Sequence, residues 1–513
     1  MRRFLFSLFY ILISSFLMAG NGDNPVTVKP DGNDLLLTFN LPKVHMEKIA
    51  VHGRQFQRIV VDKAGTTSIV GQAELPLFTI NIALQGNTLP QIQTVGKNVR
   101  VLTLNDPVYP VQAPWPKNRP LSERPFSINK GWYGETHSQP ELVSPGEVFV
   151  IRGAAGTSIT IRPFNYDPVA NSLTAVDHLV IRIHFKDSTK GYQEPSAPSF
   201  RALFHRIFVN HEEMEKPEAG LMAVGKGTKD VLRRYLIITA PEFESGLSGF
   251  VAHKESLGYA VTVVTTDVTG TTTAAIKSYL QGMYNDLATR PEFVLLVGDI
   301  DKIPAWTSNI PPDYPRNDLY YATLDGSDYF PDVFVGRFSV SNADGLQNVI
   351  SKTIDTESHL AELPKKVLFM ASDDHYDTTE ATHEYVDTNY FGPAGYDATK
   401  LYNRLNPGTA ATTNAINGGE RFAVYSGHGG WDLWADGPRF DRNNVRALTN
   451  TVYPFVFSFA CLTGKYDESE CFGETWIRVA NGGTTFWGSS VNSYWDEDDI
   501  LEKGVFNAAF VDG

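Results

Sequence analysis

Two stretches near the C-terminal end decide the fold: Phe422-Ala-Val-Tyr-Ser-Gly-His-Gly-Gly430 and Phe455-Val-Phe-Ser-Phe-Ala-Cys-Leu-Thr-Gly464. Each begins as a short apolar run, as buried parallel strands do, and ends at a reactive side chain and a glycine. The carboxyl ends of parallel strands meet at one edge of a sheet. If these strands are neighbours, the imidazole of His428 can take the thiol proton of Cys461. The N–H of Gly429 has no side chain in its way and could bind a developing oxyanion.

Each reactive residue also has an ordinary structural interpretation. A single histidine after a strand is usually a turn residue, and a single buried cysteine is usually part of the core. The second cysteine, Cys471, adds another alternative, because two cysteines in an exported protein can close a small loop as a disulfide. The residues alone therefore allow two interpretations of the cysteines, a disulfide and a catalytic thiol. The positions of a His and a Cys at two strand ends favour the catalytic thiol.

The surrounding sequence from Tyr235 onward alternates short apolar runs with helical patterns. This order predicts an α/β domain with a mostly parallel sheet. The expected strands are 235–239, 260–265, 293–297, 367–371, 422–425 and 455–459, with helices over 243–258 and 273–288. Functional side chains are then expected in the loops just beyond the carboxyl ends of these strands.

The N-terminal half has a different pattern. From about Pro25 to Asp187 it is rich in Val, Thr and Ile, with short alternating runs and frequent turn residues, which predicts an all-β sandwich or barrel-like module. Residues 111–125 hold four prolines and are expected to form a long exposed loop. Residues 190–234 are polar and basic, and we interpret them as an exposed junction where a protease would cut.

Composition excludes several classes of function. The chain has 513 residues and a net charge of −14, which argues against general binding to nucleic acid or acidic membranes. It begins with Arg2 and Arg3, an apolar run from Phe4 to Met18, and small residues from Ala19. This pattern predicts a cleaved export signal, and no later run is long enough to span a membrane. We therefore expect a secreted or cell-surface protein.

Several motifs together resemble the gingipain family of cysteine peptidases. They are Tyr425-Ser-Gly-His-Gly-Gly430, Ala460-Cys-Leu-Thr-Gly464, Cys471-Phe-Gly-Glu474, Leu295-Leu-Val-Gly-Asp-Ile-Asp-Lys-Ile-Pro304 and Asp325-Gly-Ser-Asp-Tyr-Phe-Pro-Asp-Val-Phe-Val-Gly-Arg337. In the N-terminal half, Gly71-Gln-Ala-Glu-Leu-Pro76, Arg152-Gly153 and Asn165-Tyr-Asp-Pro168 are similar to the family's propeptide, more loosely. The resemblance implies a caspase-like α/β fold preceded by an all-β prodomain.

The resemblance also implies a division of the chain. We expect a signal peptide over 1–22, a propeptide domain with a basic linker over 23–225, and a catalytic domain over 226–513. The family continues beyond the point that corresponds to Gly513, so the catalytic domain is expected to be truncated at its C-terminus.

The mechanism that the resemblance implies uses a Cys–His dyad. Cys461 is the nucleophile, His428 is the acid and base, and the N–H groups of Gly429 and Cys461 form the oxyanion hole. Cys471 corresponds to a family cysteine that needs no disulfide, so two free thiols are expected. Asp374 is the candidate that orients the imidazole, with Asp373 as the alternative and a loop-capping role as the structural interpretation.

The resemblance indicates cleavage after basic residues. Arginine-specific members place a carboxylate before a His-Glu pair, where this chain has Glu380, although a solvated helix face would explain Glu380 equally well. Lysine-specific members place an acid in the loop after the active-site strand. Here Asp498 and Asp499 follow Trp495, whose ring corresponds to a pocket wall.

Carboxylates on loops suggest a structural ion. Asp299, Asp301, Asp325, Asp328 and Asp332 could supply oxygen ligands to Ca²⁺, which relatives bind in this part of the fold. Turn formation at Asp325-Gly326 is the alternative. The chemistry itself requires no cofactor.

The sequence therefore predicts a secreted cysteine endopeptidase made as a zymogen, acting on protein or peptide substrates and inhibited by its own propeptide. We expect Lys117, Arg119 or Arg124 of the proline-rich loop to occupy the acidic pocket before activation. Two alternatives remain: a sortase-like transpeptidase of an outer-membrane secretion system, and an inactive secreted binding or adhesion protein.

Overall fold

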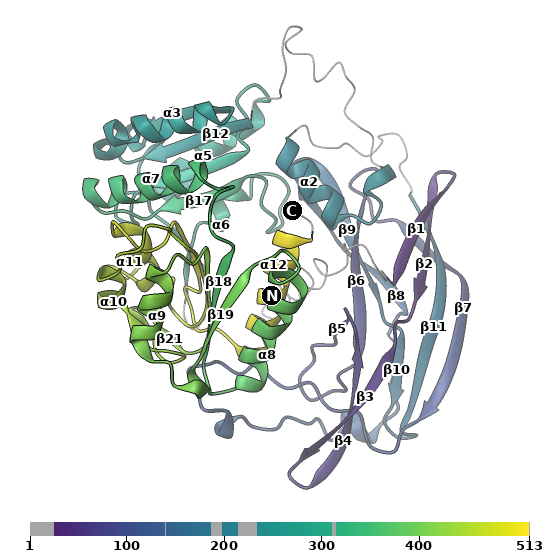
Figure 1. The fold of residues 1–513 in the computed structure, drawn as a ribbon. Helices are drawn as coiled ribbons and strands as arrows, with labels where there is room; N and C mark the ends of the chain where they lie inside the picture. Colours follow the sequence, from purple (N-terminus) through teal and green to yellow (C-terminus); the bar gives the residue numbers. More distant parts are fainter. Residues whose placement is uncertain (1–24, 139, 186–196, 214–232, 310–313, 512–513) are drawn as a thin grey trace.

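The computed structural model describes residues 25–138, 140–185, 197–213, 233–309 and 314–511. A β-rich N-terminal half and an α/β C-terminal half lie side by side (Figure 1). The predicted export signal and the central part of the basic junction lie outside the described residues.

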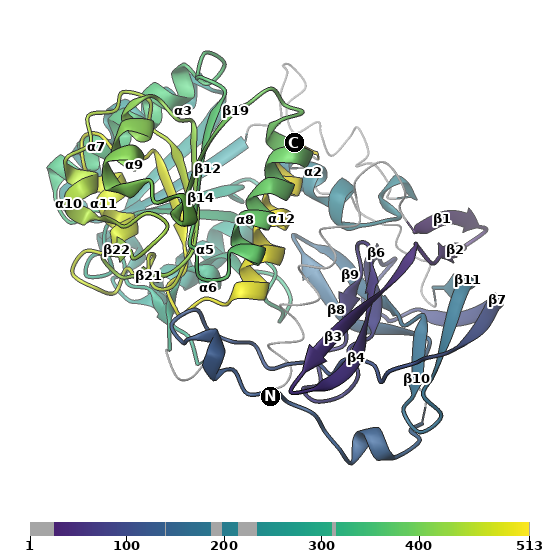
Figure 2. The ribbon, with the colours of Figure 1, turned by 60° about the horizontal axis from the view of Figure 1, so that its bottom comes forward.

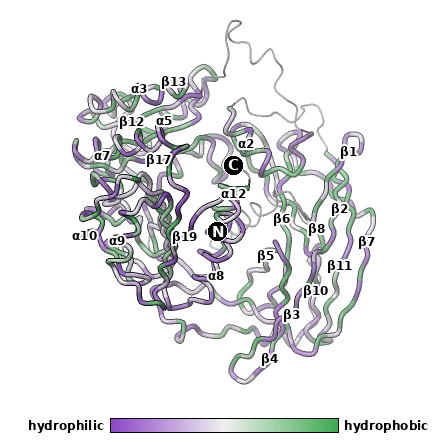
Figure 3. The backbone as a smooth tube through the Cα atoms, viewed as in Figure 1, coloured by the Kyte–Doolittle hydropathy of each residue, from purple (hydrophilic) through white to green (hydrophobic). Residues whose placement is uncertain are grey.

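The N-terminal half contains two antiparallel sheets and a hairpin that share one core. Alternate residues of its strands are buried, as in β2, and Figure 3 shows the corresponding alternation of hydropathy along the long strands. One sheet has the order β1-β2-β11-β10, with β7 also paired to β11, and the other has the order β5-β6-β9-β8. The strands are β1 (Val26–Asp31), β2 (Asp34–Asn40), β3 (Val44–Val51), β4 (Arg54–Val61), β5 (Gly65–Thr66), β6 (Pro76–Ala83), β7 (Gln91–Thr103), β8 (Val143–Ile151), β9 (Ala154–Ile161), β10 (Phe164–Asp167) and β11 (Ser172–His184).

The junction is more ordered than its polarity suggests. Helix α2 (Pro198–Ile207) begins with proline, which suits the first helical position, and buries Phe200, Phe204 and Ile207 against the core of the N-terminal half. A 3₁₀ turn, η3 (His211–Glu213), follows. The prediction of an exposed junction over 190–234 is therefore wrong at α2, whose apolar residues recur at helical spacing, and at Arg233 and Arg234, which begin strand β12.

The first half of the α/β region is a four-stranded parallel sheet, ordered β13-β12-β14-β17. Its strands are β12 (Arg233–Thr239), β13 (Tyr259–Thr265), β14 (Phe293–Val297) and β17 (Phe334–Phe338). The accompanying helices are η4 (Pro241–Leu247), α3 (Ser248–Ser256), α4 (Thr266–Thr269), α5 (Thr273–Asn285), α6 (Leu319–Ala322) and α7 (Ala343–Ser358), and β15 (Trp306–Thr307) pairs with β16 (Arg316–Asn317).

The second half is a five-stranded parallel sheet, ordered β19-β18-β20-β24-β25. Its strands are β18 (Lys366–Ala371), β19 (Asp397–Tyr402), β20 (Phe422–Ser426), β24 (Phe455–Phe459) and β25 (Thr485–Gly488). The other elements are α8 (Tyr376–Val386), η5 (Asp387–Phe391), η6 (Asn403–Leu405), α9 (Gly408–Asn417), α10 (Arg442–Arg446), α11 (Phe472–Arg478), α12 (Trp495–Phe510) and the short strands β21 (Gly429–Gly430), β22 (Leu433–Trp434) and β23 (Phe440–Asp441). The predicted parallel α/β region is confirmed, and its strands divide between two sheets.

One segment of the N-terminal half reaches the α/β half. The chain between β7 and β8, with the short helices η1 (Leu121–Glu123) and η2 (Trp132–Gly134), leaves the β-sheets and passes along the α/β half (Figure 2). It includes the proline-rich loop of residues 111–125, and Lys117 of that loop donates to the carbonyl of Phe459 at the end of β24 in the second parallel sheet.

Candidate active site

The strands that carry His428 and Cys461 are neighbours. β20 and β24 pair in parallel, with Ser426 opposite Phe459, and each reactive residue follows its strand end by two positions. Gly429 packs so closely on the second loop that a Cβ atom there would lie 2.7 Å from the carbonyl oxygen of Cys461. Only glycine fits this approach, and its backbone therefore lies directly beside the thiol residue.

The imidazole of His428 has a carboxylate partner from the next strand. β18 lies on the other side of β20, and Asp374 follows its end. Nε2 of His428 lies 2.8 Å from Oδ2 of Asp374, as a donor to the carboxylate. This contact fixes the orientation of the ring. The other ring nitrogen, Nδ1, then has a lone pair that can accept a proton. Asp373 instead accepts a hydrogen bond from Nδ2 of Asn403 at 2.9 Å.

A second aspartate holds the backbone of His428. Oδ1 of Asp436 accepts from the His428 N–H at 3.1 Å, and Oδ2 accepts from the hydroxyl of Ser372 at 2.8 Å. The hydroxyl of Tyr425 donates to the His428 carbonyl at 2.6 Å, and complete burial raises the pKa of this tyrosine, which keeps it protonated. Asp436 was missed by sequence reasoning, because it follows the short hairpin strand β22 and not a strand of the two parallel sheets.

Cys461 is 1% exposed, and its sulfur accepts a hydrogen bond from the Ser493 N–H at 3.3 Å. Burial raises the pKa of the thiol, and this amide and the positive charge of Lys117 oppose the increase. Cys471 instead caps the N-terminus of α11 in a capping box with Glu474, and burial raises the pKa of its thiol. Both thiols are free, so the structure does not support the disulfide interpretation.

A lysine of the N-terminal half fills the space beside the thiol. Lys117 is fully buried, so the prediction of an exposed loop is wrong at this residue. Its Nζ lies 2.7 Å from Oδ2 of Asp498, donates to the Phe459 carbonyl at 2.7 Å, and lies 4.8 Å from the ring centre of Trp495. An acid, a carbonyl and an aromatic face compensate the desolvation of the ammonium group.

The backbone of the same loop pairs with the site. The Lys117 N–H donates to the Ser493 carbonyl at 2.9 Å, and Pro116 forms an antiparallel bridge with Tyr494. Peptides often bind in this way: the extended backbone pairs with a neighbouring strand or loop, and a side chain enters a pocket. The loop around Lys117 binds the α/β half in the same manner.

Family comparisons agree with this geometry. The model of peptidase family C25 matches residues 230–513, which is more than half of the chain. The chain belongs to peptidase family C25. The model of the C25 propeptide matches residues 21–218, so the predicted order of a propeptide followed by an α/β peptidase domain is confirmed. We refer below to the two matched parts as the prodomain and the catalytic domain.

The names of the C25 relatives include a Lys-gingipain and gingipains R. Lys-gingipain W83 of Porphyromonas gingivalis is 28% identical over 92% of this chain, and gingipain R1 of the same organism is 25% identical over 83%. The chain spans 28% of the first relative's length and 45% of the second's. Among solved structures, the arginine-specific cysteine proteinase gingipain R is 25% identical, with a TM-score of 0.49 over 55% of this chain and 68% of the other. Together with the parallel sheets, the C25 match confirms the predicted caspase-like class for the catalytic domain.

The other acidic and basic candidates of this C25 chain have different partners. Glu380 binds the Arg404 guanidinium through both oxygens, at 3.1 and 2.7 Å, rather than Lys117. Asp499 accepts from Thr382 and pairs with Lys503 at 2.6 Å. Arg119 lies over the Trp115 ring, 5.7 Å from its centre, and Arg124 donates to the Ala113 carbonyl at 2.9 Å. Of the predicted pocket residues, Trp495 and Asp498 contact Lys117.

The carboxylates predicted to hold calcium do not fit such a site here. Asp299 pairs with Arg478 at 2.7 Å, and Asp301 lies 3.7 Å from Lys302. Asp332 accepts three backbone N–H groups, Asp328 accepts two, and Asp325 accepts the Gly326 N–H. Over the part of the chain that the structure describes, no three His, Cys, Asp or Glu side chains gather in a metal-binding arrangement.

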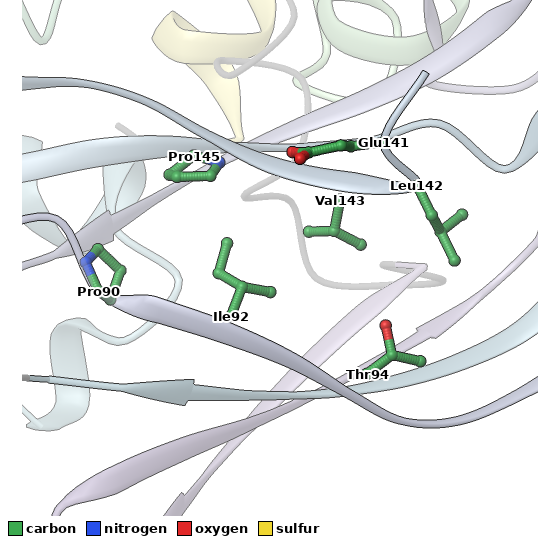
Figure 4. A pocket seen from close by; sticks show the side chains of 7 residues that line it. All are labelled: Pro90, Ile92, Thr94, Glu141, Leu142, Val143 and Pro145. Atoms are coloured by element: carbon green, nitrogen blue, oxygen red, sulfur yellow. The ribbon is translucent and has the colours of Figure 1, made fainter. Parts of the chain in front are cut away.

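A pocket of the prodomain lies elsewhere. It is lined by Pro90, Ile92 and Thr94 on one side and by Glu141, Leu142, Val143 and Pro145 on the other (Figure 4). Glu141 is the one ionisable side chain among these lining residues. None of the helices in the described ranges combines the length and the apolarity needed to cross a membrane.

Proposed function

We propose that this chain is the zymogen of a secreted cysteine endopeptidase that cleaves after lysine. One observation carries the specificity: Lys117 of the prodomain lies in the closed pocket of Asp498, Trp495 and the Phe459 carbonyl, beside Cys461. Family membership and the two specificities named among the relatives support a basic residue before the cut. The sequence pattern at residues 1–22 supports export.

The pocket favours lysine over arginine. Its polar groups converge on one point, at 2.7 Å from Nζ on both sides, which suits a compact ammonium charge. A guanidinium is planar, carries five donors and is best matched by a bidentate carboxylate. The bidentate acid of the region, Glu380, already binds Arg404.

The catalytic steps follow from the positions of the side chains. The thiolate of Cys461 attacks the carbonyl carbon after the bound lysine, and Nδ1 of His428 holds the thiol proton. The N–H groups of Gly429 and Cys461 bind the oxyanion of the tetrahedral intermediate. His428 then protonates the leaving amine, and the acyl-enzyme forms. In the second half-reaction His428 takes a proton from water, and hydroxide releases the acid.

Two aspartates prepare the histidine for this task. The Asp374 carboxylate accepts a hydrogen bond from the Nε2–H group and stabilises the imidazolium that forms in each half-reaction. Asp436 acts through the backbone, together with Tyr425, and keeps the loop after β20 in register with the loop after β24. Asp374 is thus a direct partner of the imidazole, whereas Asp436 is a positioning residue.

Latency follows from the occupied pocket. Lys117 and the antiparallel backbone pairing fill the place of a substrate, so a peptide cannot enter while the prodomain is bound. The prolines of the loop restrict its backbone and lower the entropy that its binding costs.

The test compares the uncut precursor with two variants. Lys117→Ala should open the pocket, so that iodoacetamide labels Cys461 and a short lysine-containing peptide is cleaved before any cut in the linker. Arg119→Ala is the matched control, since its side chain lies over Trp115 outside the pocket, and it should stay latent. Equal latency of both variants would contradict the proposal.

Peptide panels decide the reaction. The mature enzyme should hydrolyse peptides with lysine before the cut at least tenfold faster than matched arginine peptides. Ligated products with an added amine acceptor would instead support the transpeptidase, and absence of any turnover would support a binding protein.

A further inference from the structure

We propose that the catalytic domain has a second, separate binding site for the prodomain, an arginine anchor at the turn of the β8–β9 hairpin, and that this anchor keeps the cleaved prodomain bound. The anchor consists of Arg152 and Gly153 on the prodomain and of Asp332, Pro291 and Tyr284 on the catalytic domain. The inference builds on the proposed latency, but it concerns the lifetime of the complex rather than the blocking of the pocket.

The contacts of Arg152 are those of a buried anchor. The residue is 8% exposed, its backbone N–H donates to Oδ1 of Asp332 at 2.6 Å, and Nη1 donates to the carbonyls of Asp332 and Pro291 at 2.8 and 2.9 Å. The guanidinium carbon lies 4.8 Å from the ring centre of Phe200 and 5.9 Å from that of Tyr284. Buried, hydrogen-bonded arginines that stack on aromatic rings are typical of the residues that dominate binding energy at interfaces.

The backbone of the turn is unfavourable for arginine, which indicates that contacts of its side chain compensate the strain. Arg152 and Gly153 are the two residues between β8 and β9, with φ of 46° and 86°. Two positive φ angles define a type I′ turn, which favours Asn-Gly because side chains other than Asn, Asp and Gly are strained there. An arginine in this place costs local stability, and the contacts that it makes with the catalytic domain offset that cost.

The catalytic domain presents a formed receptor. Asp332 is fully buried, and its Oδ2 accepts the N–H groups of Leu324 and Asp325 at 2.6 and 2.7 Å, which leaves Oδ1 directed at Arg152. Beside it, Asp328 accepts the Val150 N–H at 2.8 Å. Asp328 and Asp332, two of the carboxylates that the sequence suggested for calcium, thus contact the hairpin that carries the anchor.

Apolar contacts surround the polar ones. The Phe149 ring of β8 stacks on Phe330 of the catalytic domain with centres 4.4 Å apart. Phe200 of α2 packs on Phe334 of β17 at 4.7 Å, and the Ser199 N–H donates to Glu292 at 3.0 Å. Neighbouring residues of two prodomain elements therefore contact the same surface, which excludes water from the guanidinium.

The anchor and the inhibitory lysine contact different sheets of the catalytic domain. The anchor contacts the segments around β14 and β17 of the first sheet, whereas Lys117 contacts Phe459 at the end of β24 and residues that follow β25 of the second sheet. In the uncut precursor the linker keeps the prodomain at a high effective concentration, so loss of the anchor alone should leave Lys117 in its pocket. After the linker is cut, the two contacts together set the dissociation rate.

The experiment uses the full chain with Cys461→Ala, which cannot cut itself, and a site for an exogenous specific protease inserted between residues 214 and 232. After the cut, the dissociation rate of the two halves is measured by labelling each half with a fluorophore and diluting. Arg152→Asn is the decisive variant, because Asn-Gly suits the type I′ turn and the hairpin keeps its shape. Arg182→Ala is the matched control, since it removes an exposed prodomain arginine that pairs with Asp31.

We expect Arg152→Asn to accelerate dissociation at least ~10-fold, because it removes a buried charged donor from its partners, while Arg182→Ala leaves the rate unchanged. In the uncut chain with Cys461 intact, Arg152→Asn should still protect the thiol from iodoacetamide, whereas Lys117→Ala should not. Equal dissociation of Arg152→Asn and Arg182→Ala would overturn the anchor without affecting the proposed function. Exposure of Cys461 in uncut Arg152→Asn would also overturn it, because the hairpin would then be part of the inhibitory contact.

Discussion

The two parallel sheets of the catalytic domain have the same construction but differ in the side chains just beyond their strand ends. At the first sheet, Asp299 after β14 pairs with Arg478, and Ser339 after β17 donates to Glu474, which also pairs with Arg478. These polar groups satisfy one another. At the second sheet, the residues after β18, β20 and β24 are Asp374, His428 and Cys461. Asp374 binds His428, the His428 ring lies 5.2 Å from the Trp495 ring that lines the pocket, and the Cys461 thiol is close enough to feel the charge of Lys117.

The difference shows that sheet topology offers two equivalent edges and that side chains decide how each is used. An edge whose charges are mutually paired serves stability, and the first sheet additionally receives the prodomain through Asp332. An edge where a thiol and an imidazole lie beside a pocket for a peptide side chain serves chemistry. Variants of both sheets test this comparison, in order of decreasing effect.

The largest effect is expected from the two cysteines. Cys461→Ala should lower kcat of the activated enzyme by about 10⁴-fold or more, because a dyad loses its function as a unit. Cys471→Ala should retain most activity, since this thiol caps α11. Activity and labelling by iodoacetamide are measured on both, and labelling that disappears in Cys471→Ala alone would reverse the assignment.

The glycines give a matched pair on the two sheets. Gly429→Ala places a methyl group 2.7 Å from the Cys461 carbonyl and displaces an oxyanion donor, so kcat should fall about 10²–10³-fold. Gly336→Ala in β17 of the first sheet meets no atom within 4 Å and should leave kcat unchanged. Similar losses in both variants would show that the strand ends of the second sheet have no special role.

Neighbouring aspartates on α12 test the specificity pocket. Asp498→Asn removes the charge partner of a bound lysine. The loss of transition-state stabilisation for lysine peptides should be at least about 2 kcal/mol, which lowers kcat/KM roughly 30-fold. Asp499→Asn is the control, because its carboxylate faces Lys503. Steady-state kinetics with lysine and arginine peptides measure both, and a loss confined to Asp499→Asn would place the pocket elsewhere.

The smallest effect concerns stability at the paired edge. Burial raises the pKa of Glu474 to about 7, with Arg478 opposing the increase. A carboxyl whose pKa is raised on folding contributes most to the free energy of unfolding at pH values below its ordinary pKa of 4.5. This contribution is lost as the pH rises through about 7. Glu474→Gln should therefore flatten the decline in unfolding free energy between pH 5 and 7, by up to about 1.4 kcal/mol per pH unit. Urea unfolding at several pH values measures this, and an unchanged slope would contradict it.

The neighbouring positions of His428 and Cys461 could be predicted from the sequence because strand ends are local features. Apolar runs define β20 and β24, and the rule that parallel strands share an edge places His428 beside Cys461. Asp374 could be proposed for the same reason, since it follows a third strand. Asp436 could not, because its role depends on how the loop after β22 folds back onto the backbone of His428.

Contacts between the two halves depend on the tertiary structure. The sequence identified three basic candidates in the proline-rich loop but could not choose among them, nor between Glu380 and Asp498 as their partner. The choice follows from the docking of the prodomain, which buries Lys117 completely and leaves Glu380 bound to Arg404.

By itself, the sequence determined the family, the α/β class, the β-rich prodomain and the placing of His428 and Cys461 at neighbouring strand ends, because hydrophobic periodicity and short motifs act over a few residues. Only the tertiary structure decided which charges meet: Lys117 with Asp498, and Arg152 with Asp332. Burying a charge is costly unless a partner is present at the same point, and the positions of residues far apart in the chain are set by the packing of whole domains. No local pattern carries that information.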